Sequence, residues 1–187
     1  MPDNRDDGTH FPELRVLEQN VFRDTRGTFV ELWRNHDARA PSLPAFVQDN
    51  LARSRRGVVR GLHFQNPRAQ VKFVTAIDGE IFDVAVDVRV GSPTFGRWAA
   101  FTLSGSNGRQ LYVPAGFAHG YQTVSDVSVV MYKCSDFYSP DDERAVRWDD
   151  DDLAIPWPVR DAVVSPRDAG ARCLRDLLPE WLPSIDS

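Results

Sequence analysis

The chain has 187 residues, of which 42% are hydrophobic and 11% aromatic, and its net charge at pH 7 is −5. This length suits a buried core, so we expect residues 1–187 to form one domain, with a flexible polar segment over about the first ten residues. The negative charge argues against a general nucleic-acid-binding protein, which needs a broad basic face. No apolar run approaches the roughly 20 residues of a membrane span, and the polar N-terminus is unlike a signal peptide, so we expect no membrane partner and a cytoplasmic location.

Short apolar segments rich in Val, Phe, Ile and Tyr dominate the chain, separated by Gly, Pro, Asp and Ser, and helical periodicity is scarce. Outside one hairpin, this pattern predicts strands near residues 15–23, 28–33, 45–51, 57–64, 97–104, 109–113, 119–124 and 128–137. About ten short strands at such spacing indicate a β-sandwich or barrel.

The pair Asp78-Gly79 lies between two further apolar segments, 71–77 and 80–88. Because Asp-Gly accepts the positive backbone angles of a tight turn, the pattern predicts a β-hairpin at this place. In the second segment Asp83 and Asp87 alternate with valines of the opposite face, which predicts a half-buried antiparallel strand.

Beyond Asp149 the composition changes to four consecutive aspartates and several prolines. The aspartates at 149–152 are expected in a solvated turn. A helix is predicted near 166–178, with Ser165 as its cap, Pro166 in the first turn and Asp168 completing a capping box.

A metal site is not expected, because a catalytic metal needs about three convergent ligands and a strand offers them as His-x-His. The residue two positions after His63 is Gln65. The remaining histidines are His10, His36 and His119. Two cysteines, Cys134 and Cys173, form neither a metal-binding pair nor a disulfide framework, and reduced thiols are expected.

Several polar residues interrupt the apolar strand segments. They are Gln48, Asn50, Arg60, His63 and Lys72. Burying them is costly unless they serve a ligand or hydrogen-bond one another, and the sequence leaves both open. Lys72 is one of only two lysines, and a lysine can hydrogen-bond a developing oxyanion and change its pKa.

The arginines at 53, 55, 56 and 60 fit either a small anionic ligand or a solvated loop. Tyr132 shares its strand face with Val130 and Cys134, which by itself favours a core tyrosine.

Seven ordered segments carry a resemblance to a known family. They are FRDTRGTFVE (22–31), FVQDN (46–50), GVVRGLHFQ (57–65), GEIFDVAVD (79–87), SPTFG (92–96), PAGFAHG (114–120), and YKC through YSP (132–140). From about Val16 to Leu178 the chain resembles the dTDP-4-dehydrorhamnose 3,5-epimerase family.

This resemblance implies an all-β, cupin-like jelly-roll barrel, with a short C-terminal helical segment, that acts as a homodimer. Because an open sheet edge invites uncontrolled pairing, we expect barrel-edge strands to form the dimer contact. It implies a dTDP-linked 4-keto-6-deoxy sugar as substrate, epimerised without metal or other cofactor. The alternatives are an epimerase of one centre only, at carbon 3 or 5, and a non-enzymatic or metal-dependent cupin that binds sugar. Gln65 disfavours the last.

The family motifs also imply roles for single residues. His63 would be the base, supported by Asp168, Tyr132 the acid, and Lys72 the group that stabilises an enolate oxygen. The alternative role for Asp168 is capping of the C-terminal helix. The implied substrate-binding residues are Arg26, Glu31, Gln48, Asn50, Arg60, His119, Glu143 and Arg167, with Tyr138 stacking on the thymine.

Four positions depart from the common family pattern and put the number of inverted centres in doubt. They are Ala52 for serine, Val71 for glycine, Thr75 for arginine, and Arg167 for lysine. The spacing of Arg60 and His63 raises a separate question, because residues an odd number apart point to opposite faces of a regular strand. We therefore predict an irregularity at Gly61, or else that Arg60 serves the barrel rim.

Overall fold

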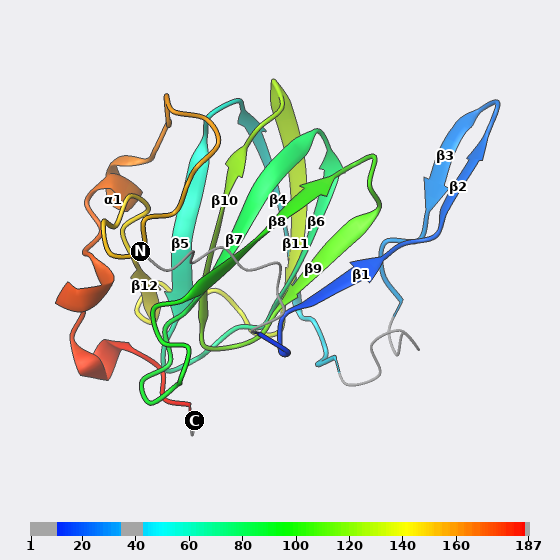
Figure 1. The fold of residues 1–187 in the computed structure, drawn as a ribbon. Coiled ribbons are helices and arrows are strands. Elements are labelled where there is room, and N and C mark those ends of the chain that lie inside the picture. Colours follow the sequence, from blue (N-terminus) through cyan, green and yellow to red (C-terminus); the bar gives the residue numbers. More distant parts are fainter. Residues whose placement is uncertain (1–10, 35–42, 186–187) are drawn as a thin grey trace.

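A computed structural model describes residues 11–34 and 43–185, in which two five-stranded antiparallel sheets face each other (Figure 1). The first sheet has the order β1 (Arg15–Glu18), β9 (Arg109–Val113), β6 (Lys72–Asp78), β11 (Val127–Cys134) and β4 (Gln48–Arg55). The second has the order β12 (Glu143–Ala145), β5 (Val59–Gln65), β10 (Phe117–Thr123), β7 (Glu80–Asp87) and β8 (Trp98–Ser104). The expected all-β jelly-roll barrel is confirmed.

A third, two-stranded sheet projects from the barrel (Figure 1). It consists of β2 (Val21–Asp24) and β3 (Gly27–Val30), and we call residues 21–30 the arm. The sequence predicted one strand over 15–23, whereas the chain leaves the barrel after Glu18 and begins β2 at Val21. The expectation for the first ten residues, together with His10 and His36, lies outside the described residues.

The main core fills the space between the two sheets, because alternate side chains of both sheets point inward. Val74, Leu111 and Val130 come from the first sheet, and Ile81 and Phe117 from the second. The same alternation brings polar side chains of β4, β5, β10 and β11 into one end of the barrel.

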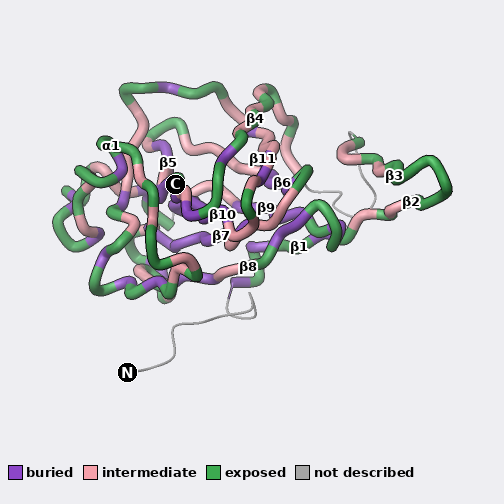
Figure 2. The backbone as a smooth tube through the Cα atoms, turned by 90° about the horizontal axis from the view of Figure 1, so that it is seen from above, coloured by how far each residue is buried: buried purple, intermediate pink, exposed green. Residues whose placement is uncertain are grey.

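The outer face of the second sheet is covered as well, by the C-terminal part of the chain (Figure 2). Val84 and Val86 of β7 pack there against Leu153, Ile155 and other C-terminal side chains. The prediction that this strand is half-buried was therefore wrong. Both of its faces are covered, because residues beyond 145 pack on the face that would otherwise meet water.

The predicted hairpin at Asp78-Gly79 was wrong in its pairing. Gly79 has the expected positive φ of 72°, and its N–H donates to the Asp78 carboxylate at 2.9 Å. However, β6 pairs with β9 and β11 of the first sheet, whereas β7 pairs with β8 and β10 of the second. The turn therefore carries the chain from one sheet to the other.

The C-terminal helix is shorter than predicted. The α-helix α1 spans Pro166–Ala169 and ends at Gly170, and two 3₁₀ turns follow at Leu174–Asp176 and Pro179–Trp181. Within the described residues, no helix is long and apolar enough to cross a bilayer.

The aspartates at 149–152 are not all solvated. Asp150 is 2% exposed, and its carboxylate accepts N–H groups of Asp152, Leu153 and Leu174. It thus joins the turn at residues 150–153 to the 3₁₀ turn that begins at Leu174, because a buried carboxylate needs such partners.

Candidate active site

A cavity of about 540 Å³ opens between the two sheets. Of the residues predicted from the sequence, it is lined by Arg60, His63, Lys72, His119, Tyr132, Tyr138, Glu143, Arg167 and Asp168. A smaller cavity of about 240 Å³ adjoins it, shares several of these side chains, and adds Gln48 and Asn50. The structure therefore brings together all but two of the predicted site residues.

His63 of β5 and Asp168 of α1 form a close pair. His63 Nε2 lies 2.6 Å from Asp168 Oδ1, and the Asp168 N–H donates to the capping Ser165 Oγ at 3.1 Å. The helix cap and the His63 contact thus coexist, because the cap uses the backbone N–H of Asp168 and leaves its carboxylate free to contact His63. Burial raises the pKa of Asp168, but the hydrogen bond with His63 and further donors outweigh it, so the pKa is lowered.

The predicted irregularity between Arg60 and His63 is confirmed. His119 of β10 pairs with His63, but Tyr121 pairs with Arg60, so β5 contains one extra residue at this point. Gly61 has a φ of 119°, and a Cβ there would meet the Gly120 Cα at 2.6 Å. This bulge lets both Arg60 and His63 face the cavity, and glycine is required for the close approach.

Tyr132 of β11 reaches the same cavity from the opposite sheet. Burial raises the pKa of its hydroxyl above the usual value, despite the opposing effect of Arg60. A tyrosine in this setting keeps its proton at neutral pH and can donate it. Tyr132 and His63 therefore stand on facing walls of the cavity.

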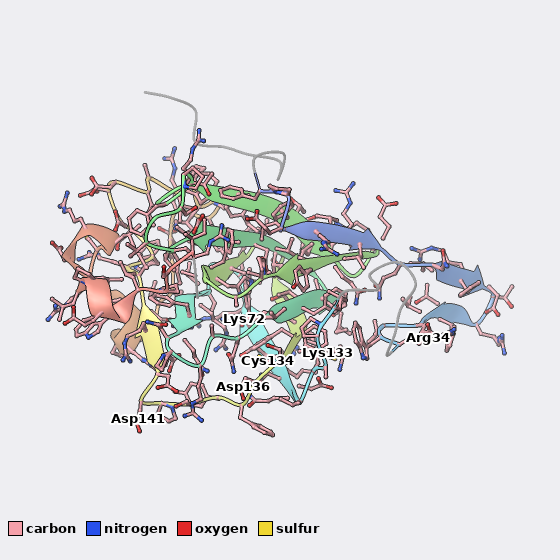
Figure 3. All side chains as sticks on the ribbon, turned by 90° about the horizontal axis from the view of Figure 1, so that it is seen from below. Arg34, Lys72, Lys133, Cys134, Asp136 and Asp141 are labelled. Carbon is pink, nitrogen blue, oxygen red and sulfur yellow. The ribbon has the colours of Figure 1, made fainter. Side chains whose placement is uncertain are left out.

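Lys72 of β6 lies beside Cys134 of β11, its cross-strand partner (Figure 3). Its Nζ donates to the carbonyl oxygen of His63 at 3.0 Å. Burial lowers the pKa of Lys72, with Cys134 and Glu143 acting in the opposite direction. The ammonium group is thus held at the cavity wall next to the backbone of the histidine.

The mouth of the cavity is formed by Tyr138, Glu143 and Arg167. The Tyr138 hydroxyl donates to Glu143 Oε2 at 2.5 Å, and Arg167 bonds the same oxygen. The Gln48 side chain accepts the Tyr138 N–H at 2.9 Å and donates to Asn50 Oδ1 at 3.0 Å. Tyr138 is 48% exposed, which leaves its ring available for stacking.

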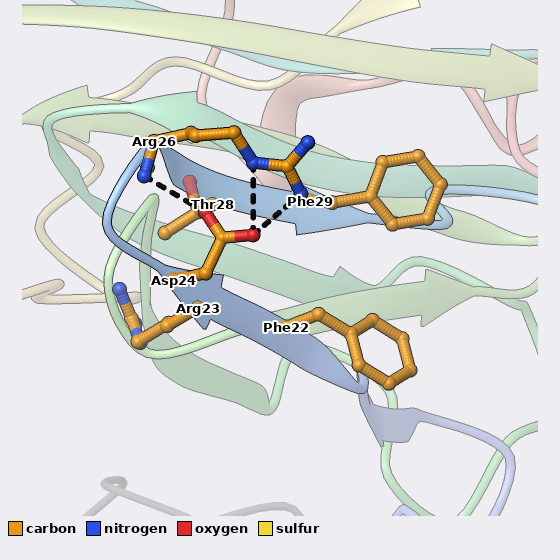
Figure 4. Close-up of a pocket in the computed structure, with 7 residues that line it drawn as sticks. Phe22, Arg23, Asp24, Arg26, Thr28 and Phe29 are labelled. Carbon is orange, nitrogen blue, oxygen red and sulfur yellow. Dashed lines mark hydrogen bonds and ion pairs between the residues drawn. The ribbon is translucent and has the colours of Figure 1, made fainter.

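Arg26 and Glu31 do not lie at this cavity. Arg26 stands at the tip of the arm, where it pairs with Asp24 at 2.6 Å, and its side chain is 89% exposed (Figure 4). Glu31 follows β3 and pairs with Arg34. The arm has a separate cavity of about 470 Å³, lined by Phe22 and Phe29 among others, which shares no residue with the cavity that contains His63.

Two residues of the cavity region were not predicted from the sequence. Asp83 of β7 accepts His119 Nε2 at 2.9 Å and is fully buried. Tyr121 lies two residues after His119 and lines the cavity. The period of two along a strand could have identified Tyr121, because it shares the inward face of His119.

The departures from the family pattern lie in different surroundings. Thr75 faces away from the cavity, where its hydroxyl accepts Gln110 Nε2 at 2.7 Å. The Val71 N–H donates to Ser135. Ala52 lines the cavity directly, and Arg167 binds Glu143 at its mouth.

The described residues contain no cluster of three or more potential metal ligands.

Known proteins resemble this chain over most of its length. The family model described as dTDP-4-dehydrorhamnose 3,5-epimerase matches residues 8–176. A protein of that description from Pseudomonas aeruginosa is 46% identical over 168 residues, covering 88% of this chain and 93% of its own. One from Neisseria gonorrhoeae is 44% identical over 166 residues, and the chain spans 51% of that longer protein.

The fold has a close counterpart among solved structures. The 3,5-epimerase from Legionella pneumophila, crystallised with dTDP-4-keto-L-rhamnose, superimposes with a TM-score of 0.91 at 42% sequence identity. The match covers 96% of this chain and 97% of that chain.

Proposed function

Because this chain belongs to the dTDP-4-dehydrorhamnose 3,5-epimerase family, an isomerase family, we propose that it converts dTDP-4-dehydro-6-deoxy-D-glucose into dTDP-4-dehydro-L-rhamnose by inverting carbons 3 and 5. The observation that carries the proposal is the placement of His63 and Tyr132 on facing walls of one cavity. Inversion requires that a proton leave one face of the sugar and return on the other. Two groups on opposite sides meet this need.

The ketone at carbon 4 makes the hydrogens on carbons 3 and 5 acidic. His63 removes one of them, which leaves an enolate whose negative charge lies on the carbon-4 oxygen. Since Asp168 occupies Nε2 of His63, Nδ1 is the nitrogen that takes the proton. Asp168 fixes this tautomer and stabilises the imidazolium that forms.

Lys72 provides positive charge for the enolate oxygen. Its ammonium is already oriented by the His63 carbonyl, so little reorganisation is needed when the charge develops. Tyr132 returns a proton to the opposite face of the carbon, and proton exchange with solvent then restores neutral His63 and protonated Tyr132 before the second carbon is inverted. Its raised pKa supports this role, because a protonated hydroxyl is available at neutral pH.

The nucleotide is bound by the mouth of the cavity and its surroundings. Arg60 donates through Nε to Ser54 Oγ at 3.0 Å, which orients its guanidinium, and arginine can grip a diphosphate through two donors at once. Arg167 supplies a second cation, and Tyr138 a ring for the thymine. Gln48, Asn50, His119 and Glu143 complete the polar lining.

The active form is a homodimer, in which the arm of one protomer reaches the cavity of its partner. Phe22 and Phe29 of the arm are 60% and 70% exposed, and such an apolar projection is stabilised by burial against another chain. The arm would then bring Arg26 and Glu31 to the substrate. We also predict contacts between barrel-edge strands in the dimer, a single domain over residues 1–187, and a cytoplasmic location.

Mixing inactive variants tests the arm contact. Arg26→Ala and His63→Asn proteins are each expected to have little activity. If the arm acts on the partner, subunit exchange creates dimers with one intact site, and activity returns on mixing. Absence of recovery, with exchange verified by tagged subunits, would show that the arm does not complete the partner's site. A monomer by light scattering would refute the dimer itself.

Proton NMR in deuterated water tests the reaction. The dTDP-4-keto-6-deoxy sugar is incubated with enzyme, and we expect deuterium at both carbon 3 and carbon 5. Label at one carbon only would identify a single-centre epimerase, which the Ala52 and Val71 departures make worth testing. No label at either carbon would refute the epimerase assignment and leave a sugar-binding protein.

A further inference from the structure

Tyr121 is a deeply buried tyrosine in the floor of the cavity. It lies on β10 and is 3% exposed, and its ring packs into the core between the sheets. Its inward direction follows from its cross-strand partners, Asp83 on β7 and Arg60 on β5. None of the roles proposed for the other cavity residues uses its hydroxyl.

The hydroxyl of Tyr121 has no hydrogen-bond partner among the described residues. The Ser54 hydroxyl lowers the pKa of Tyr121 as a weak hydrogen-bonding neighbour, but the two hydroxyls are not in hydrogen-bond geometry, and the Ser54 oxygen accepts the Arg60 Nε–H at 3.0 Å. Burial dominates and raises the pKa of Tyr121 to about 12, so the hydroxyl stays a neutral donor. Leaving such a group unsatisfied destabilises the folded protein, and phenylalanine would avoid that cost at nearly the same volume.

The surroundings of the hydroxyl indicate which part of a ligand it would meet. Arg60 and Tyr132 are near enough to affect its pKa, and all three residues line the same cavity. The mouth, by contrast, is formed by the exposed Tyr138 and Arg167. A nucleotide held at the mouth would place its sugar, and not its base, over the floor.

We propose that the Tyr121 hydroxyl donates a hydrogen bond to an oxygen of the pyranose ring or its substituents in the bound nucleotide sugar. This inference rests on the proposed function, because it takes the sugar to occupy the floor of the cavity. Tyr121 is then a sugar contact and not a nucleotide contact. The unsatisfied hydroxyl is satisfied only when the sugar is bound, which makes it a determinant of specificity.

The test compares Tyr121→Phe with Tyr112→Phe, a matched substitution of a half-buried tyrosine on β9 that does not line the cavity. Affinity is measured by calorimetry for dTDP alone and for the dTDP-4-keto-6-deoxy sugar, both in a His63→Asn background that prevents turnover. For Tyr121→Phe we expect about 3- to 10-fold weaker binding of the sugar nucleotide, the effect of one neutral hydrogen bond. Binding of dTDP should change less than twofold. Tyr112→Phe should change neither.

Thermal unfolding separates this role from a structural one. Because the hydroxyl lacks a partner in the free protein, Tyr121→Phe should keep or raise the Tm, while the stabilisation given by the sugar nucleotide falls. A lower Tm, with equal loss of affinity for dTDP and for the sugar nucleotide, would make Tyr121 a structural residue. Unchanged affinity for both ligands would also overturn the proposal. These measurements need no turnover, so a failure of the epimerase assignment would show separately, as absent deuterium exchange in the parent protein.

Discussion

Replacing Asp168 by Asn removes the charge that supports His63 and preserves the volume of the side chain. The contact is a 2.6 Å hydrogen bond between His63 Nε2 and a carboxylate that is almost fully buried. Hydrogen bonds to charged groups contribute about 1.5–3 kcal/mol. At about 1.36 kcal/mol for each factor of ten, loss of this stabilisation in the transition state lowers the rate about 10- to 150-fold.

A change in the tautomer of His63 would lower the rate of Asp168→Asn further. An asparagine that turns its NH₂ group toward Nε2 leaves the ring proton on Nδ1, and that nitrogen then cannot accept a proton from the sugar. A wrong tautomer in a comparable histidine–carboxylate pair lowers kcat by about 10⁴-fold. We therefore expect Asp168→Asn to lose between ten- and ten-thousand-fold, measured as deuterium entry at carbons 3 and 5 by proton NMR.

Ser165→Ala is the control for this substitution. It removes the 3.1 Å bond between the Asp168 N–H and the cap, but keeps the carboxylate. Loss of a cap costs about 1 kcal/mol, or about 2–4 °C in Tm for a chain of this size, and the rate should fall less than fivefold. If Asp168→Asn keeps more than a third of the exchange rate, or if Ser165→Ala loses as much, the carboxylate does not act through His63.

Three further outcomes are expected. Tyr132→Phe should still allow deuterium to enter the sugar in its original configuration, while formation of the inverted product falls steeply. His63→Asn should keep less than about a hundredth of the exchange at either carbon. Near-normal inversion by Tyr132→Phe would show that Tyr132 is a core tyrosine. Burial lowers the pKa of Lys72 below the usual lysine value of 10.5. Activity should therefore fall as the pH rises toward that value, because the ammonium loses its proton. Lys72→Arg should move this fall upward, since arginine stays charged, and an unchanged pH profile would remove Lys72 from the reaction. Activity should be complete after exhaustive chelation, and recovery only on addition of metal would point to the metal-dependent alternative.

The barrel strands were largely predictable, because apolar alternation is a local signal. The segment that forms β12, Glu143–Ala145, has no such alternation, and it is a strand only because β5 offers it an edge. The pairing of β6 and β7 was not predictable from Asp78-Gly79 either. A turn motif fixes the backbone at the turn, but the sheet that each strand joins depends on distant partners.

The cavity residues were identified through motifs, and their convergence follows from the fold. The bulge at Gly61 is an exception, because the odd spacing of Arg60 and His63 predicts either an irregularity there or an Arg60 that serves the barrel rim, and the structure has the irregularity. Arg26 and Glu31 illustrate the limit of such reasoning. A motif assigns a residue to a substrate, but it does not say whether the fold brings that residue to the same cavity, and these two lie away from it. Tyr121 was overlooked because an inward tyrosine in a core strand looks like packing until its hydroxyl is seen to lack a partner.

The order of strands in the two sheets determines when this protein can fold during its synthesis. Among the described strands, only β2 with β3 and β7 with β8 pair with their neighbours in sequence. β1 must wait for β9, and β4 for β11, which ends at Cys134. Such non-local pairing slows folding, and unpaired strand edges invite aggregation. A nascent chain shorter than about three quarters of the protein therefore holds β4 with no partner, and the barrel closes only when most of the polypeptide has left the ribosome.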